Sequence, residues 1–484
     1  MRTTFLGHQG WLFATDNTCL MVDPLLVEEM GHGGVIGRVH PPRSLDLQSF
    51  PPMDAVVYTH EHEDHFSIPS LNRLDRRIPI YISERSSIAA RRILEEMGFR
   101  VGLLSPGEVL AVGDLELSCF SPDHVKRAHL DEWDVLPFLI KDRGGDGSFF
   151  SSVDVETTAE TLGAARAIAP RPGLYCYTNN TSWWDFQRAG KVRAALPLDT
   201  ASGTRWLIDA YRKLCALWSP PAAALVCGGG VAFSGDRAWM NHHVFTADSA
   251  AIFAALRCVF PDKLFIVPAP GQTITMKQGE VSAVEDRTPF VSARTPSEWP
   301  SREYRPVVSL MEEYRPATGR ATLPSEDREA LARELSAFGK HIYAGPIYRG
   351  LYSLTKEDLQ GRKPTFVLVL YVDDDGDSIT FEYRPQACDF VLVDSVDPFG
   401  EYVAGMECWA TDLLSVLSGD LAPTAITFGR MREWTMAPRR LSFDIGSVLC
   451  LYSHPLRRSD SFLRLYRRLL AAEPASVPTV PAAH

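Results

Sequence analysis

Short apolar runs alternate with amphipathic stretches along the first half of the chain, and this alternation predicts an α/β fold. The clearest helix is predicted over residues 86–97, where Ser86 or Ser87 can cap the start and Gly98 marks the end. Buried strands are predicted at residues 54–59, 79–83, 222–227 and 263–267. We therefore expect one α/β domain over residues 1–286.

The pattern changes near residue 287. Six prolines and many charges fall between residues 287 and 325, which predicts an irregular linker or arm. Residues 326–470 then predict a small α+β domain. Its predicted elements are helices at 326–341 and 401–417 and strands at 364–372, 378–383 and 389–393. The Ala- and Pro-rich stretch 471–484 predicts a disordered tail.

Composition and charge favour a soluble enzyme. The 484 residues suggest two or three domains, and the net charge of −11 argues against nucleic-acid binding, because phosphate contact needs clustered Lys and Arg. Nine scattered cysteines without a C-x-x-C pair favour buried free thiols in a reducing cytosol over a disulfide framework. The N-terminus lacks a signal-peptide pattern, and no apolar stretch approaches the roughly twenty residues that span a bilayer. We therefore expect a cytoplasmic protein without a membrane span.

The densest chemistry of the chain lies in six residues, His60-Glu61-His62-Glu63-Asp64-His65, patterned His-x-His-x-Asp-His. They follow the predicted strand 54–59, and Ser67 and Pro69 after them can begin a helix. The cluster therefore lies where a strand ends and a helix starts, the edge of an open α/β sheet at which ligands usually bind. The alternative is a solvated polar loop in which charged residues happen to cluster.

The spacing within this cluster predicts a metal site. Residues two apart on an extended chain point the same way, so His60 and His62 can reach one ion together. Asp64 and His65 fall past the strand, where a turn can swing them toward a neighbouring ion. Imidazole nitrogen and carboxylate oxygen suit zinc, iron or manganese, and the absence of thiolate argues against a closed structural zinc site.

The string from Thr59 to His65 resembles the signature of the metallo-β-lactamase fold superfamily. The segments Phe5 to Gly10 and Leu20 to Pro24 are similar to the first strands of its lactonase-like and phospholipase D-like branches. The resemblance covers about residues 1–275. It implies a four-layer αβ/βα sandwich and one or two divalent metal ions, zinc or, for redox chemistry, iron.

The resemblance implies two further ligands. The superfamily has a His after a later strand, and His124 follows the apolar strand 115–120. It also has a bridging Asp at the end of another strand, where this chain has Asp154, although Val153 stands where a Gly usually precedes that Asp. The alternatives are a surface-loop role for His124 and, for Asp154, an N-cap of a helix that begins at residues 155–158.

The last ligand that the resemblance implies is missing. The superfamily places a final His in a turn after a strand, and the matching segment 264–273 has Pro270 there, which offers no donor atom. Upstream, His242 and His243 stand where relatives often keep one His near the substrate. Either could fill the empty coordination place, line the pocket or pack in the turn that starts a helix. The second metal position would otherwise depend on Asp64, His65 and Asp154.

These residues predict a metal-dependent hydrolase. A metal held by His60, His62 and His124 would lower the pKa of bound water toward neutrality, and the resulting hydroxide would attack an ester, lactone, amide or phosphodiester. Asp64 would be the catalytic residue that orients this water and passes its proton to the leaving group.

A di-iron oxygenase or another redox enzyme on the same fold is the alternative function. Members of the superfamily that hold iron tend to depart from the His pattern at the second site, as Pro270 does here. An aromatic run that includes Tyr175 and Tyr177 could wall an oxygen-protected pocket, and ordinary core packing explains it equally well. A metal-binding protein without catalysis is the third hypothesis.

The C-terminal segment 326–470 resembles the sterol-carrier-like modules appended to alkylsulfatase-type members of the superfamily. Such a module would shape a hydrophobic substrate tunnel or the interface of a homodimer. The expected partners are therefore a small-molecule substrate and, through this module, a second copy of the chain, with no nucleic acid.

Overall fold

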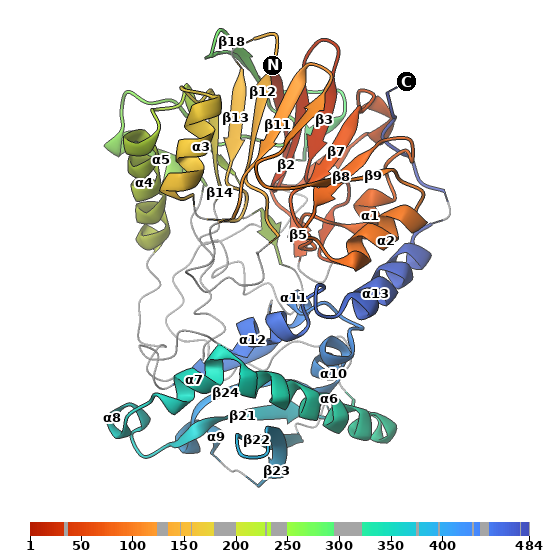
Figure 1. Cartoon of the computed structure of the whole chain (residues 1–484), viewed down its shortest axis with the longest axis vertical. Coiled ribbons are helices and arrows are strands. Elements are labelled where there is room, and N and C mark those ends of the chain that lie inside the picture. Colours follow the sequence, from red (N-terminus) through yellow and green to blue (C-terminus); the bar gives the residue numbers. More distant parts are fainter. Residues whose placement is uncertain are drawn as a thin grey trace.

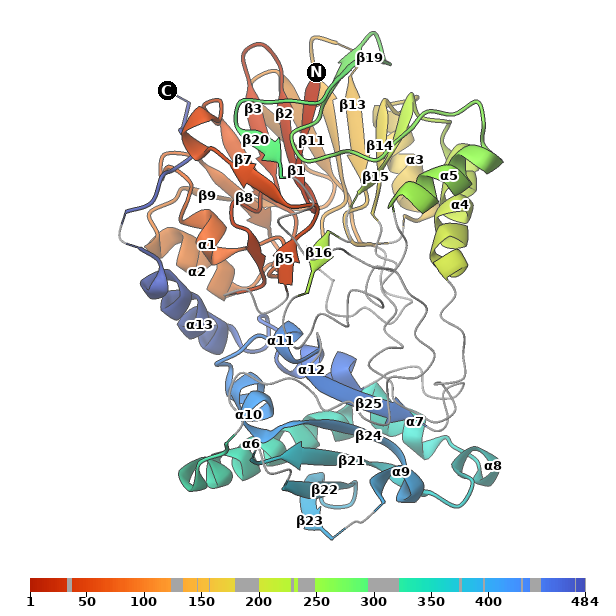
Figure 2. The same cartoon turned by 180° about the vertical axis from the view of Figure 1, so that it is seen from behind.

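The computed structural model of the chain is shown from two sides in Figures 1 and 2. It describes residues 1–32, 37–122, 134–145, 147–155, 157–178, 200–227, 230–233, 249–294, 322–373, 377–394, 397–427, 430–435, 445–474 and 476–483. The predicted ligands His124, His242 and His243 lie outside these residues. Among the described helices, none is both long and apolar enough to cross a bilayer.

An eight-stranded sheet carries the metal-type motif. Its strand order is β19-β18-β1-β2-β3-β7-β8-β9, and the last four strands are parallel. The bounds are β1 (Arg2–Gly7), β2 (Gly10–Ala14), β3 (Cys19–Val22), β7 (Ala55–Tyr58), β8 (Ile80–Ser83), β9 (Val101–Leu104), β18 (Thr273–Lys277) and β19 (Glu280–Glu285). The predicted strands at 54–59 and 79–83 are therefore β7 and β8.

A seven-stranded sheet packs against the first one. Its strand order is β10-β11-β12-β13-β14-β15-β17, and its last four strands are parallel. The bounds are β10 (Val109–Val112), β11 (Leu115–Cys119), β12 (Phe138–Asp142), β13 (Ser148–Ser151), β14 (Leu174–Thr178), β15 (Ala223–Cys227) and β17 (Phe265–Ile266). One apolar core, which includes Trp11, Phe13, Phe149 and Leu225, fills the space between the sheets.

Helices cover the outer face of each sheet. On the eight-stranded sheet lie α1 (Ile68–Leu71) and α2 (Ile88–Glu96), and on the seven-stranded sheet lie α3 (Ala159–Ile168), α4 (Thr200–Leu217) and α5 (Ser249–Val259). The predicted cap of the helix near residue 87 is confirmed, because the Ser87 side chain accepts a hydrogen bond from the Ala90 N–H. Four layers result, so the predicted αβ/βα sandwich is confirmed.

Small sheets and a short 3-10 helix complete this region. β4 (Glu29–Met30), β5 (Gly37–Val39) and β16 (Val231–Ala232) form one sheet, and β6 (Arg43–Leu45) pairs with β20 (Val291–Ala293); the 3-10 helix η1 spans Leu47–Ser49. The expectation of an irregular arm over residues 287–325 is wrong at β20, because Val291 is buried and its strand pairs with β6. Residues 295–321 of that arm lie outside the described residues.

The C-terminal region forms a separate five-stranded sheet of order β23-β22-β21-β24-β25 (Figure 1). Its strands are β21 (Lys363–Tyr371), β22 (Ser378–Arg384), β23 (Asp389–Val393), β24 (Tyr402–Trp409) and β25 (Met431–Thr435). Its helices are α6 (Ser325–Ala344), α7 (Pro346–Tyr352), α8 (Lys356–Leu359), α9 (Pro398–Glu401), α10 (Ala410–Ser418), α11 (Thr424–Thr427), α12 (Ile445–Tyr452) and α13 (Ser459–Ala472).

One predicted helix of this region is wrong in its first half. Residues 401–417 were expected to be helical throughout, but Tyr402–Trp409 forms the strand β24 and only Ala410–Ser418 forms a helix. All eight residues of β24 are buried, and the strand lies between β21 and β25. A strand buried on both faces has no polar alternation, so its sequence pattern does not distinguish it from a buried helix.

The predicted disordered tail, residues 471–484, is also wrong. Ala471 and Ala472 end helix α13, and residues 480 and 482 make β-bridges to Leu74 and Met53. Val480 is fully buried in the core of the eight-stranded sheet and its helices. The tail is ordered because its small apolar side chains fill a surface that the sequence pattern does not reveal.

Helix α13 ties the two regions together. It packs on α2 and α1 in both views, and its apolar side chains, Phe462, Leu463, Leu465 and Tyr466, belong to the core of the first region. The last helix of the chain therefore stabilises the domain that carries the His-rich motif.

Candidate metal centre

The His-x-His-x-Asp-His motif forms the turn between β7 and α1. The N–H groups of His65 and Phe66 both donate to the His62 carbonyl oxygen, at 3.0 and 2.7 Å, which folds the chain back on itself. Ser67 then caps α1, since its side chain accepts from the Ser70 N–H. The predicted order of strand, motif and capped helix is confirmed.

A first group of donor atoms joins this turn to the seven-stranded sheet. His60 Nε2 and His65 Nε2 lie 3.3 and 2.9 Å from the same oxygen, Oδ2 of Asp154, which follows β13. Neither imidazole nitrogen makes a hydrogen bond with acceptable geometry, and both rings are buried. The alternative of a solvated polar loop is therefore wrong. Two nitrogens and a carboxylate oxygen that converge without a hydrogen bond fit a metal ion.

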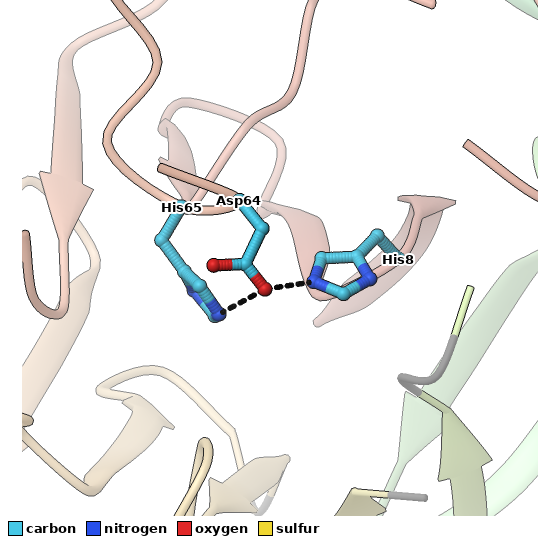
Figure 3. Close-up of side chains that lie close together, drawn as sticks. All are labelled: His8, Asp64 and His65. Carbon is cyan, nitrogen blue, oxygen red and sulfur yellow. Dashed lines mark hydrogen bonds and ion pairs between the residues drawn. The ribbon is translucent and has the colours of Figure 1, made fainter. Parts of the chain in front are cut away.

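A second group shares His65. His8 Nε2 lies 3.1 Å from Asp64 Oδ2, and His65 Nε2 lies 3.9 Å from the same oxygen. Figure 3 shows the three side chains pointing toward one another. One donor atom from each residue of a group lies within 4.8 Å of the others. The sequence interpretation missed His8 as a candidate ligand, although it noted the string Phe5 to Gly10 that contains it.

His62 belongs to neither group among the described residues. Its ring lies 4.6 Å from that of His60, measured between centroids. The structure thus brings together four of the predicted site residues, His60, Asp64, His65 and Asp154, and adds His8 to them.

Asp23, at the end of β3, orients the turn from behind. Its carboxylate accepts hydrogen bonds from the Thr59 N–H at 2.7 Å, from Thr59 Oγ1 at 2.6 Å and from His65 Nδ1 at 2.9 Å. Because Nδ1 of His65 donates to Asp23, Nε2 is the nitrogen that remains for a metal. Thr59 Oγ1 also lies 3.0 Å from His60 Nδ1 and can fix that ring in the same way. Asp23 is a functional residue that sequence reasoning missed.

The backbone is strained at three residues of the centre. His8, Asp23 and Val153 have φ values of 53°, 46° and 55°, in the left-handed region that non-Gly residues rarely adopt. Val153 thus has the conformation that favours the Gly usually found before Asp154, at a cost of about 1–3 kcal/mol. The Val153 carbonyl accepts from Thr178 Oγ1, and its N–H donates to Ser151 Oγ, which holds this conformation.

The alternative role of Asp154 as a helix cap is wrong. Helix α3 begins at Ala159, and its cap is Thr158, whose side chain accepts from the Thr161 N–H. Asp154 instead accepts a hydrogen bond from Gln9 Nε2 at 3.3 Å. Gln9 and His8 are neighbours in the turn between β1 and β2, so one turn contacts both carboxylates of the centre.

The electrostatics of the centre favour a bound cation. Burial alone would lower the pKa of His65, but Asp154, Asp23 and Asp64 outweigh it and raise that pKa well above its usual value. Burial would raise the pKa of Asp64 and of Asp154, but the neighbouring His65 lowers both below the usual range. Burial and the charge of His65 lower the pKa of His60, which keeps it as the neutral imidazole that binds metals. The carboxylates are therefore ionised and ready to bind a cation.

The two glutamates of the motif connect it to the C-terminal region. Glu61 accepts from the N–H and Oγ of Ser87 and, at 2.8 Å, from the hydroxyl of Tyr466 on α13. Glu63 accepts from Thr424 Oγ1 on α11, also at 2.8 Å. Both glutamates are buried. They anchor the turn to α2, α11 and α13, a role that the sequence does not reveal.

A cavity of about 190 Å³ lies next to Asp154. Ser152 and Val155, which flank Asp154, line it together with Tyr175 and Tyr177 of β14. Tyr175 and Tyr177 also belong to the apolar core beneath helices α3 to α5, so both the predicted aromatic wall and ordinary core packing remain open for them. The rest of that aromatic run lies outside the described residues. Within the part of the chain that the structure describes, the Tyr177 hydroxyl is buried without a hydrogen-bond partner.

Comparison with known proteins places this centre in context. A family model described as a beta-lactamase superfamily domain matches residues 21–168. An uncharacterized protein of Mycobacterium tuberculosis is 32% identical over 73 residues, which are 15% of this chain and 19% of that protein. The chain therefore spans about a fifth of the length of the curated relatives it matches.

Two solved structures show a similar arrangement of elements. CmlA, a diiron β-hydroxylase from Streptomyces venezuelae, is 16% identical, with a TM-score of 0.36 over 57% of this chain and 54% of that one. An isothiocyanate hydrolase from Delia radicum gut bacteria is 13% identical, with a TM-score of 0.39 over 57% of this chain and 100% of that one. None of these comparisons separates the lactonase-like branch from the phospholipase D-like branch.

Proposed function

We propose that the chain is a metal-dependent hydrolase of an ester, lactone, amide or phosphodiester, because a family model described as a beta-lactamase superfamily domain matches residues 21–168. One observation carries the proposal: two buried imidazole nitrogens, from His60 and His65, converge within 3.3 Å on one Asp154 oxygen, and neither makes a well-aligned hydrogen bond. Such atoms are costly to bury unless they bind something, and a divalent cation matches their charge and donor type.

The residues of the centre have separate roles in this proposal. His60, with His62 and His124, would hold one ion, and Asp64, His65 and Asp154 would hold a second. Among the described residues, His60, His65 and Asp154 lie close enough together to bind one ion. A divalent ion bound there lowers the pKa of coordinated water and polarises a carbonyl or phosphoryl oxygen. Asp64 would orient the attacking water and carry its proton to the leaving group. His242 or His243, which lie outside the described residues, would contact the metal or the substrate.

The cavity next to Asp154 supplies room for part of a substrate. Its apolar lining, Val155, Leu162 and the rings of Tyr175 and Tyr177, suits an apolar group, and Tyr177 offers a hydroxyl that can donate to it. The proposed substrate is thus a small molecule with a hydrolysable bond and an adjoining apolar part.

A di-iron oxygenase is the second candidate, and one observation favours it. The group formed by His8, His65 and Asp64 has two imidazoles and one carboxylate, a donor set typical of non-haem iron sites. The buried tyrosines beside Asp154 would shield such a site from water.

Metal analysis separates the two candidates. The protein is purified from cells supplemented with zinc or with iron, and its metal content, visible spectrum and turnover of esters, lactones, amides and phosphodiesters are measured. A colourless zinc protein that hydrolyses one of these classes supports the hydrolase. About two irons with a charge-transfer band, and no hydrolysis, would contradict it.

Two variants test the centre itself. His60→Ala should lose most of the bound metal, because the substitution removes one of the imidazole nitrogens that would bind the ion. His341→Ala is the matched control, since His341 lies on α6 in the C-terminal region, and this variant should keep its metal. Full metal occupancy in His60→Ala would refute the site.

A further inference from the structure

The turn that carries Pro270, where the superfamily's final His is expected, lies directly beside strand β1. The Gly271 N–H donates to the Phe5 carbonyl at 2.8 Å, and the Phe5 N–H donates to the Gln272 carbonyl at 3.0 Å. Antiparallel pairing of β1 with β18 continues this contact. A residue just past the end of β1 therefore emerges at the same edge of the sheet as a side chain at position 270.

His8 is that residue, and the backbone commits it to the centre. It follows Gly7, the last residue of β1, and Gly10 opens β2, so His8 stands in a tight turn. Its φ of 53° is left-handed, and Gly7 before it has a φ of 108°. Gly230 passes so close that a Cβ there would lie 3.3 Å from the His8 Cα.

The imidazole of His8 points at the incomplete metal group. It is 4% exposed, and its Nε2 lies 3.1 Å from Asp64 Oδ2. Ligand atoms around one tetrahedral zinc with bonds of 2.0–2.1 Å lie about 3.3 Å apart. Asp64 Oδ2 lies 3.1 Å from His8 Nε2 and 3.9 Å from His65 Nε2, and these two distances bracket this value.

We propose that His8 is the protein ligand that completes the second metal position with Asp64, His65 and Asp154, replacing from strand β1 the imidazole that Pro270 cannot supply. The proposal rests on the proposed function in that it requires a two-metal centre. A His eight residues from the N-terminus thus takes the place of one that relatives carry after a much later strand.

The test compares two substitutions of His8 that keep the turn intact. His8→Gly and His8→Asn both tolerate the left-handed backbone, because Gly and Asn are the residues that adopt it most readily. His8→Asn also keeps an amide that can donate to Asp64, but it is a poor metal ligand. His341→Ala is the control, since His341 lies on α6 in the C-terminal region, outside both groups.

The apoproteins are titrated with Zn²⁺ and with Co²⁺, and bound metal per chain and the cobalt absorption spectrum are recorded. The wild type should bind about two ions, whereas both His8 variants should bind about one and lose one set of cobalt bands. His341→Ala should match the wild type.

Several results would overturn the assignment. Two ions in His8→Gly would show that His8 is no ligand, and two ions in His8→Asn alone would show that it only positions Asp64. An equal loss in His341→Ala would also overturn it, as would a wild type that binds one ion and is unchanged by His8→Gly. This last result leaves the hydrolase standing, whereas a wild type that binds no metal refutes the proposed function itself.

Discussion

The two regions of the molecule bury polar groups in different ways. In the C-terminal region, the buried Glu407 and Arg432 lie on neighbouring strands and pair with each other. In the first region, buried His60 and His65 nitrogens converge on a carboxylate without hydrogen bonds. Buried polar atoms without a hydrogen-bond partner occur elsewhere too, for example at Trp434 in the C-terminal region, but only at the centre do imidazoles and carboxylates converge among the described residues. This convergence marks the centre as functional.

Backbone strain shows the same difference. Three non-Gly residues with left-handed φ, His8, Asp23 and Val153, surround the metal-type groups. In the C-terminal region such residues, Gln360 and Cys388, lie at turns between elements. Among the described residues, no group of metal-type side chains occurs in that region. Strain at the centre is therefore part of its construction. The C-terminal region, which contacts the metal turn through Tyr466 and Thr424, is called the scaffold.

The largest expected effect is the loss of His65, which belongs to both groups. His65→Ala should weaken metal binding at both positions by more than about 100-fold, because removing a ligand should cost more than removing its outer partner. Isothermal titration of the apoprotein with Zn²⁺ measures this. Glu407→Gln, which alters the buried pair of the scaffold, should leave metal binding unchanged. Equal losses in the two variants would abolish the distinction between the regions.

The next effect tests whether the scaffold also supports the centre. Tyr466→Phe and Thr424→Val each remove one hydrogen bond to a buried glutamate of the metal turn. Each should lower the free energy of unfolding by about 1–3 kcal/mol and weaken metal binding by about 10-fold. Urea denaturation and zinc titration measure the two quantities.

Tyr383→Phe provides the control for that pair. The Tyr383 hydroxyl donates to the Gly339 carbonyl wholly within the C-terminal region, and the ring is buried. Its loss should cost a similar free energy of unfolding with no change in metal affinity. If Tyr466→Phe behaves in the same way, the contact from α13 is structural only.

Local sequence patterns predicted one half of the centre well. The apolar run of β7, the spacing of His60 to His65 and the Ser67 cap all lie within a few residues, so they can be interpreted without the fold. The resemblance added Asp154, whose contact with His60 spans the two sheets.

Long-range pairing explains what the sequence could not predict. His8 reaches Asp64 across 56 residues, and Tyr466 reaches Glu61 across 405, so neither contact leaves a local pattern. The sequence pattern of strand β24 predicts a helix because the strand is buried on both faces. The pattern of the tail predicts disorder because the partners of the tail, near residues 53 and 74, are distant in sequence. Each error is a case of tertiary burial outweighing local propensity.

A smaller effect concerns the ordered tail. Val480 is fully buried against the first region, whereas Val477 in the same tail is half-buried. Val480→Ser should lower the free energy of unfolding by about 2 kcal/mol, because an apolar side chain leaves the core and a hydroxyl enters it. Val477→Ser should change it by less than about 0.5 kcal/mol. Equal effects, measured by urea denaturation, would mean that the tail does not dock.

The smallest effect lies in the scaffold and depends on pH. Burial, with the charge of Arg457 beside it, lowers the pKa of His341 from 6.5 to about 4. The folded protein therefore binds this proton less readily than the unfolded chain, so stability should be complete above pH 6.5 and decline as the pH falls toward 4. Because His341 is partly exposed, the decline should be at most about 1 kcal/mol. His341→Gln should remove this part of the pH dependence in urea denaturation at several pH values, while zinc binding at neutral pH stays unchanged. An identical pH dependence in the variant would show that the low-pH loss of stability arises elsewhere, with the buried imidazoles of the metal centre as the first place to look.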